Sequence, residues 1–256
     1  MNALYALTGL LVGVLVGLTG MGGGSLMTPA LILIAGIRPT VAVGSDLAYS
    51  AVMKFVGAFQ HRRAGNVDAT LAIRLAIGSI PGGLLGVGCL HFMEMRLGDG
   101  AQMMVSRLLG AVLVLVAALT LAQSLGILSG RGRFVQGERT RSSLRWCVPI
   151  GALLGFLVGA TSVGTGTLFA VALMNVFGLS PKKTVGTDIQ HAALLTSALA
   201  LANASTGHVN AYLVGNLLLG AIPGVILGSR LAVRMPDRVI RPCMAGVLFL
   251  CGLRMI

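Results

Sequence analysis

Acidic residues are scarce in this 256-residue chain, which carries 7 Asp and Glu against 19 Lys and Arg. Only 10% of the residues are charged and 5% are aromatic, whereas 55% are hydrophobic, and the mean hydropathy is +0.91. This composition excludes an ordinary soluble domain, in which about a quarter of the residues are charged. Four apolar runs have the roughly 20 residues that a helix needs to cross a bilayer core of about 30 Å: 103–128, 146–163, 183–203 and 209–233. A multi-pass integral membrane protein is therefore expected.

The spacing of cysteine pairs and the pattern typical of a signal peptide are also missing from the printed sequence. The four cysteines stand singly in or beside apolar runs, without the spacing of a zinc site or a redox motif: Cys89, Cys147, Cys243 and Cys251. We interpret them as packing residues and predict neither a metal site nor a cofactor. The start of the chain, MNALYALTGLL, has no basic region and no small-residue cleavage site. We expect a retained first helix rather than a signal peptide.

The net charge of +12 comes mostly from Arg and Lys in short loops between apolar runs. Such placement follows the positive-inside rule, so the charge indicates orientation in a lipid bilayer and no nucleic-acid partner. The linker 129–145 holds five Arg against Glu138. We interpret it as a cytoplasmic loop, with binding to anionic lipid headgroups as a weaker alternative.

A glycine-rich break interrupts the first apolar segment, in the stretch from Gly13 to Pro29. An apolar helix reaches the run Gly20–Gly24, breaks, and restarts at Ser25, and a second copy of the stretch begins at Gly155. Non-helical backbone at membrane depth is tolerated only where it is buried in protein or lines a wet cavity. Broken helices at matching positions in two halves of a membrane protein are typical of a transport site.

An internal repeat relates the two halves. A shift of 142 residues, which places Gly13 on Gly155, aligns them without a gap, and it also places VGSD at Val43–Asp46 on VGTD at Val185–Asp188. The predicted units are a first repeat at 1–128, the linker at 129–145 and a second repeat at 146–256. Each repeat has five hydrophobic elements, expected near 3–20, 25–36, 41–60, 67–92 and 103–128, then near 146–163, 167–178, 183–203, 209–233 and 238–256.

Loop charge indicates that the repeats are inverted. The basic run 61–63 follows the third element of the first repeat, whereas the equivalent loop 203–208 has no Lys or Arg. The next connection reverses this, with four Arg between 230 and 241 against an Arg96 that acidic neighbours balance. Corresponding loops therefore face opposite sides of the membrane. We predict an all-α polytopic membrane protein with two inverted repeats. Each repeat begins with either a re-entrant hairpin or two crossings.

The glycine breaks are the first candidate for a binding site. A helix that restarts at Ser25 or Thr167 presents unpaired backbone N–H groups and the positive end of its dipole, which favour an anion. Close helix packing alone explains the glycines that precede the breaks: Gly13, Gly17, Gly155 and Gly159. It explains the dense runs poorly, so we predict that these residues bind a small anionic substrate: Gly22, Gly23, Gly24, Ser25, Gly164, Gly166 and Thr167.

Paired acids near the start of the third elements are the second candidate. Asp46 and Asp188 lie in apolar segments, where an acid is costly and marks a functional site by default, so both are candidates for proton coupling. The alternative, that they are N-terminal charges favoured by the helix dipole, stays open. Ser45 and Thr187, one residue earlier, are predicted to offer hydroxyls to the substrate.

Three further polar residues lie in the same elements. Lys54 either attracts an anionic substrate or extends to the interface beside the basic run 61–63. His191 shares a helix face with Asp188, which predicts a role in proton coupling or a hydrogen-bonded packing role. Gln190 is predicted to contact the substrate. Ser25 or Ser162 with His191 would suit an intramembrane hydrolase, but nothing fixes a base, so no enzyme is expected.

With these motifs, the chain resembles the sulfite exporter TauE/SafE family of membrane transporters. The similarity covers nearly the whole chain and rests on GLTGMGGGSLMTPAL, IRPTVAVGSDLA and AGNVD, with the echoes VGATSVGTGTLF and LSPKKTVGTD. It implies export of small sulfur-containing anions such as sulfite, sulfonates or sulfoacetate across the cytoplasmic membrane. Family members commonly carry a Thr-Ser pair where this chain has Ser45 and Asp46. Beside an anion, Asp46 needs a proton or a cation to neutralise it.

The sequence as a whole predicts a secondary transporter that works by alternating access, with one anion between the two broken-helix regions. Proton coupling is an open addition to this prediction. A passive anion channel on the same scaffold is the alternative. The substrate, the direction of transport and a homodimeric assembly are left open.

Overall fold

The computed structural model describes residues 3–19, 24–126, 145–232 and 237–256. The linker 129–145 lies outside these ranges except for its last residue, and so do Gly20, Gly22 and Gly23 of the first break. The described residues form ten helices and no strand, which confirms the all-α fold.

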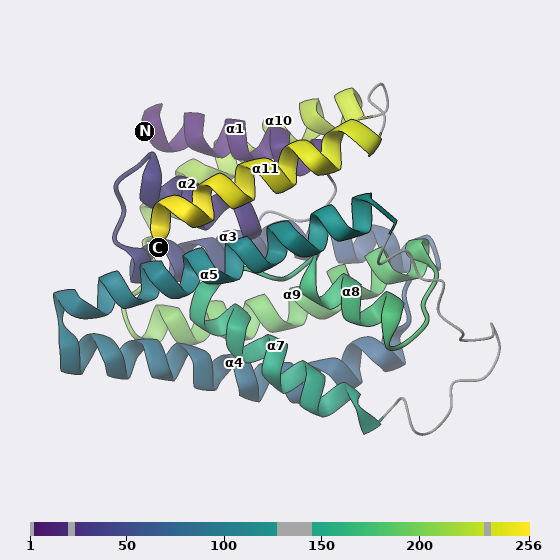
Figure 1. Cartoon of the computed structure of the whole chain (residues 1–256), viewed down its shortest axis with the longest axis horizontal. Helices are drawn as coiled ribbons and strands as arrows, with labels where there is room; N and C mark the ends of the chain where they lie inside the picture. Colours follow the sequence, from purple (N-terminus) through teal and green to yellow (C-terminus); the bar gives the residue numbers. More distant parts are fainter. Residues whose placement is uncertain (1–2, 20–23, 127–144, 233–236) are drawn as a thin grey trace.

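Five helices belong to each repeat (Figure 1). Those of the first are α1 (Ala3–Thr19), α2 (Gly24–Leu33), α3 (Pro39–Arg63), α4 (Ala69–Leu97) and α5 (Asp99–Ser124). Those of the second are α7 (Cys147–Thr161), α8 (Leu168–Asn175), α9 (Pro181–Ser205), α10 (Ala211–Ala232) and α11 (Asp237–Met255). Both polar helices, α3 and α9, start with proline, whose fixed φ suits the first helical position.

Helix length separates crossing segments from short ones. Three described helices are long and apolar enough to cross a membrane: Ala69–Leu97, Gly100–Ser124 and Ala211–Leu231. The α2 and α8 helices, with 10 and 8 residues, are too short to cross alone, because a helix rises about 1.5 Å per residue. The outer surface exposes many large apolar side chains, among them Leu85, Leu201 and Leu250, as expected for a surface that contacts lipid.

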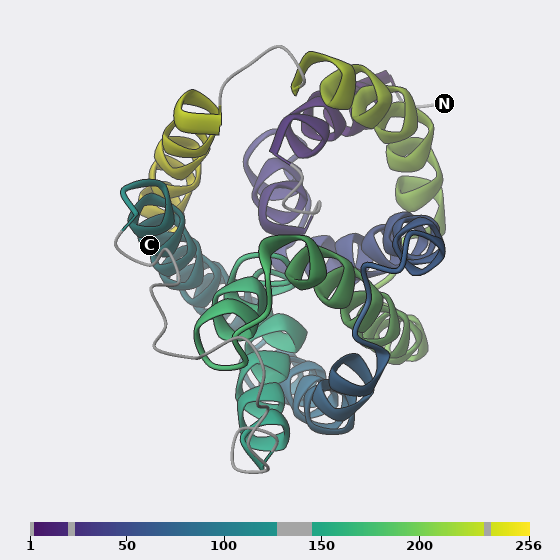
Figure 2. The ribbon, with the colours of Figure 1, turned by 90° about the vertical axis from the view of Figure 1, so that its right-hand side faces the viewer.

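The helices pair across the two repeats. The α1 helix packs along α10 and α4 packs along α7, while α3 lies along α9 and α5 along α11 (Figures 1 and 2). Under the 142-residue shift, α1 corresponds to α7 and α10 to α4, so the first two pairs are one contact made twice. The repeats are therefore interleaved, and each contributes a helix to the other's bundle.

Glycines line the contacts between α1 and α10 and between α4 and α7, and we call these two contact lines the glycine seams. A Cβ added at Gly13 would lie 2.6 Å from the backbone oxygen of Ala221 in α10, and one at Gly17 would meet Val225. On the other seam, a Cβ at Gly155 would meet Ser79 of α4, and one at Gly159 would meet Gly83. This confirms the packing interpretation of these four glycines, because only the lack of a side chain lets the backbones approach so closely.

Candidate functional site

The break in the second repeat has a left-handed backbone. Ser162 ends α7 with φ +62°, and Gly164 and Gly166 have φ of +112° and +116°. The chain then restarts in α8 at Leu168, with Thr167 at the N-cap position. In the first repeat α1 ends at Thr19 and α2 begins at Gly24. Both restarts lie within one residue of the predicted positions, and Ser25 and Thr167 are both buried.

Asp46 lies at the centre of a hydroxyl cluster. Its carboxylate is fully buried. It accepts hydrogen bonds from Thr28 Oγ1 at 2.5 Å, Ser162 Oγ at 2.8 Å and Ser50 Oγ at 3.3 Å. These donors come from α2, from the break of the second repeat and from α3. Ser162, in the break of the second repeat, thus donates a hydrogen bond to the acid of the first repeat. The sequence does not predict this contact.

Asp188 has a different environment. The backbone N–H of Gly166 donates to its carboxylate, while Oδ1 of Asp188 is buried without a hydrogen-bond partner among the described residues. Lys54 interacts electrostatically with both Asp188 and Asp46. Its Nζ is buried and likewise has no hydrogen-bond partner in the described part of the chain. The repeat equivalent of Lys54 is Thr196, so this cation exists on one side of the pseudo-symmetry only.

A cavity of about 300 Å³ brings these groups together. Its polar lining includes Lys54, Asp188, Gly166, Ser50 and Tyr49, and apolar side chains of α1, α3, α8, α9 and α10 complete the wall. The Tyr49 hydroxyl is the third buried polar atom of the lining with no hydrogen-bond partner among the described residues. Sequence reasoning missed Tyr49, although it lies three residues after Asp46 and thus on a neighbouring part of the same helix face.

Ser45 and Thr187 hold loops in this structure. The backbone N–H of Asn210 donates to Ser45 Oγ at 3.2 Å, and that of Asp68 donates to Thr187 Oγ1 at 2.9 Å. Asp68 and Asn210 are themselves related by the 142-residue shift, so the two contacts are symmetric. The adjoining Gly44 packs against the backbone of His208, and its equivalent Gly186 packs against Asn66. The paired VGSD and VGTD sequences therefore dock the loop that follows the third helix of the opposite repeat.

His191 and Gln190 lie away from the cavity lining. The Nε2 atom of His191 is 2.7 Å from Ser79 Oγ, and its ring lies 4.3 Å from that of Phe169 between centroids. Gln190 is half-buried on α9. Ser162 and His191 thus have separate partners in Asp46 and Ser79, and they do not form the serine–histidine pair that a hydrolase needs.

Comparison with known proteins gives one consistent result. The family model described as "Sulfite exporter TauE/SafE" matches residues 5–255. The chain is 40% identical over 259 residues to "Probable membrane transporter protein YjnA" of Bacillus subtilis (strain 168), with all of both chains covered. It is 28% identical to "Probable membrane transporter protein YdhB" of the same organism, over 94% of this chain and 96% of that protein. No solved structure matches the chain.

Proposed function

The chain belongs to the sulfite exporter TauE/SafE family and is a membrane transporter, and we propose that it carries small sulfur-containing anions through the cavity between α3 and α9. The observation that supports this substrate class is the set of polar atoms on the cavity wall. Lys54 Nζ and the Tyr49 hydroxyl are donors without partners among the described residues, and both are buried. A buried ammonium that faces two carboxylates but has no hydrogen-bond acceptor among the described residues is costly, and an anion with several oxygen atoms offsets that cost by accepting from it.

Substrate selection in this proposal comes from Lys54, Tyr49 and the second break. The ammonium supplies charge, and the Tyr49 hydroxyl donates a hydrogen bond to an oxygen of the anion. The left-handed backbone around Gly164 and Gly166 leads into the start of α8, where the N–H of Gly166 donates to Asp188. We propose that the anion accepts from other N–H groups of this break. We extend the same role to Gly22–Gly24, Ser25 and Thr167 at the two restarts, and to the Ser45 and Thr187 hydroxyls when the docked loops move. The predicted contact of Gln190 also belongs to such a moved state.

The charges around the cavity support our proposal of proton coupling. One cation, Lys54, faces two carboxylates, Asp46 and Asp188. A monovalent anion that binds Lys54 adds a further negative charge to a buried site, and a proton on a carboxylate offsets it. Asp188 is the proposed carrier, because its Oδ1 has no hydrogen-bond partner among the described residues, whereas hydroxyls hold both oxygens of Asp46. His191 is the proposed relay from the buried side of α9.

The glycine contacts between α1 and α10 and between α4 and α7 support a proposal for the parts that move during alternating access. Separation of α1 from α10, or of α4 from α7, would open backbone contacts that only glycine permits. We therefore propose that the moving bodies are these interleaved helix pairs rather than the two repeats as sequence units. The α3–α9 pair, which carries the cavity, lies between them (Figure 2).

Uptake into proteoliposomes tests this function. Labelled sulfite and a labelled sulfonate are supplied outside, with unlabelled anion inside. We expect saturable counterflow for at least one of them, and loss of most of that flux in Lys54→Met. The matched control is Lys183→Met, since Lys183 is exposed at the start of α9. Flux equal to that of empty liposomes for all these anions contradicts the substrate class, and current without counterflow identifies a channel.

A further inference from the structure

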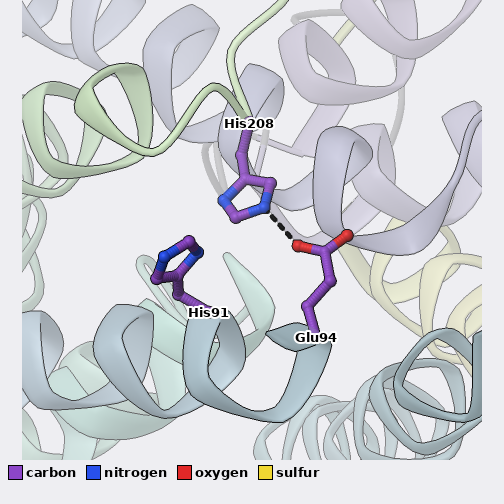
Figure 3. A group of neighbouring side chains, drawn as sticks. All are labelled: His91, Glu94 and His208. Atoms are coloured by element: carbon purple, nitrogen blue, oxygen red, sulfur yellow. Dashed lines mark hydrogen bonds and ion pairs between the residues drawn. The ribbon is translucent and has the colours of Figure 1, made fainter. Parts of the chain in front are cut away.

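A second polar cluster lies away from the cavity, where α4 ends beside the loop between α9 and α10. His91 and Glu94 lie on α4 and His208 lies in the loop, and one potential ligand atom from each residue is within 4.8 Å of the others (Figure 3). His91 and Glu94 share a helix face because they are three residues apart. The side chains of all three point toward one another.

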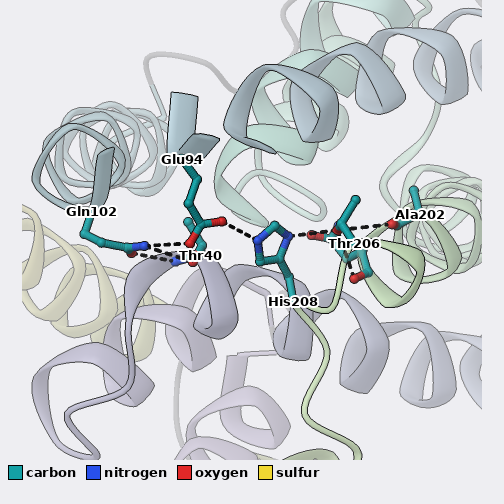
Figure 4. Close-up of polar contacts among 7 residues, drawn as sticks. Thr40, Glu94, Gln102, Ala202, Thr206 and His208 are labelled. Carbon is teal, nitrogen blue, oxygen red and sulfur yellow. Dashed lines mark hydrogen bonds and ion pairs between the residues drawn. The ribbon is translucent and has the colours of Figure 1, made fainter. Parts of the chain in front are cut away.

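Hydrogen bonds around His208 fix which of its nitrogens faces the cluster. Thr206 Oγ1 donates to a backbone oxygen, that of Asn203 at 3.1 Å, and lies 2.8 Å from His208 Nδ1 (Figure 4). With its proton directed at that carbonyl, the hydroxyl accepts from Nδ1–H, and we assign this tautomer to the ring from the two contacts. The remaining nitrogen, Nε2, then presents its lone pair to Glu94 Oε2, 2.5 Å away. Two acceptors at this separation share a proton, and a metal ion can take the place of that proton once the two atoms move apart.

Two donors orient the carboxylate of Glu94 in the same way. Gln102 Nε2 donates to Oε1 at 3.0 Å and Thr40 Oγ1 donates to it at 3.3 Å (Figure 4). Oε2 is left to face His208. The Nδ1 atom of His91 is buried and has no hydrogen-bond partner among the described residues. Such outer partners, which fix ring tautomers and carboxylate orientation, are typical of metal centres.

From this arrangement we propose that His91, Glu94 and His208 bind a divalent transition-metal ion of the zinc type. Two imidazoles and one carboxylate suit Zn²⁺ and its first-row neighbours, and three protein ligands leave one position for water. Bonds of about 2.0–2.2 Å place the ligand atoms of a tetrahedral site about 3.3 Å apart, so side-chain rotations that separate His208 Nε2 from Glu94 Oε2 and bring His91 closer complete the site. Sequence reasoning predicted no metal site, because it gave no reason to bring His208 to the end of α4.

The metal site occurs once and joins the two repeats. The positions equivalent to His208, His91 and Glu94 under the 142-residue shift are Asn66, Val233 and Pro236, which offer no such ligands. A bound ion links α4 of the first repeat to a loop of the second. That same loop packs on Gly44 and Ser45, so the metal would hold it against α3. The site does not depend on the transport activity proposed above.

Calorimetry with untagged, chelator-treated full-length protein in detergent tests the site, with Zn²⁺ as the probe. We expect one saturable ion per chain. We expect that binding to be lost in His91→Ala and in His208→Ala, and to be kept in His61→Ala, which removes a histidine outside the cluster. Thr206→Val keeps all three ligands but frees the His208 ring, so it should weaken Zn²⁺ binding about 10- to 100-fold. Size-exclusion profiles and far-UV spectra establish that each variant is folded.

A spectroscopic measurement on the unmodified protein covers the case in which a variant fails to fold. Co²⁺ in place of Zn²⁺ should give visible absorption of a four- or five-coordinate site with nitrogen and oxygen ligands, and Zn²⁺ should displace it. The absence of saturable Zn²⁺ binding, or equal binding in wild type, His91→Ala and His208→Ala, overturns the proposal. In either case the positive species between His208 and Glu94 is a proton.

Discussion

The Ser162 hydroxyl donates a hydrogen bond to the Asp46 carboxylate at 2.8 Å, and this bond joins the broken helix of one repeat to the buried acid of the other. Ser162 is also the only non-glycine residue with positive φ in the described part of the chain. A strained backbone position therefore places a donor on a carboxylate that has no access to water. A change in the geometry of the second break would therefore move one of the hydrogen-bond donors of Asp46.

Ser162→Ala should lower the stability of the protein. It removes one of three donors to a buried carboxylate, and a hydrogen bond to a charged group contributes about 1.5–3 kcal/mol. The measurement is the thermal unfolding midpoint of the detergent-purified protein. Ser162→Gly should lose less than Ser162→Ala, because glycine adopts the left-handed conformation without strain. The control is Ser205→Ala, which removes an exposed hydroxyl bonded only to a backbone oxygen within its own helix. Midpoints that coincide for Ser162→Ala and Ser205→Ala contradict this prediction.

Tyr49→Phe should weaken substrate binding and leave the fold intact. The substitution removes only a buried hydroxyl that has no partner among the described residues, so the unfolding midpoint should stay the same or rise. If that hydroxyl donates to the bound anion, KM for the transported anion should rise roughly tenfold or more, as expected for a lost hydrogen bond to a charged group. Concentration-dependent uptake into proteoliposomes measures it. Tyr212→Phe is the matched control, since Tyr212 is exposed on α10. A KM that both variants leave unchanged excludes Tyr49 from the site.

The sequence predicts the helices of this protein well, because glycine and proline residues mark where the apolar runs end. Apolar runs of membrane length end at glycine or proline, so all ten predicted elements appear with ends shifted by only a few residues. The restarts at Ser25 and Thr167 follow from the same glycine signals. The polar stripe on α3 was also open to prediction, because Asp46, Ser50 and Lys54 recur every four residues and share one face.

Contacts between the repeats are the part that one sequence does not contain. Ser162 and Asp46 are 116 residues apart, and Glu94 and His208 are 114 apart. The residues around each of these side chains do not indicate which distant residue it contacts. Symmetry reasoning also has a limit in this chain, because it treats Asp46 and Asp188 alike. The structure gives the first three hydroxyl donors and the second a backbone donor opposite Lys54, whose repeat equivalent is a threonine.

Gly82→Ala and Gly88→Ala should have opposite effects, although both lie in α4. A Cβ at Gly82 would collide with the backbone of Ala152 in α7, whereas one at Gly88 meets nothing within 4 Å. Overpacking costs about 1–3 kcal/mol, and backbone atoms cannot rotate away, so Gly82→Ala should lower the thermal unfolding midpoint clearly. Gly88→Ala should keep or raise it, since alanine is favoured over glycine in a helix by up to about 1 kcal/mol. The equivalent seam in α10 provides a replicate, in which Gly224 faces Leu10 and Gly215 meets nothing within 4 Å. Equal midpoints within both pairs would show that these helices pack less closely than the structure has them, and would contradict our proposal that the interleaved pairs are the moving bodies.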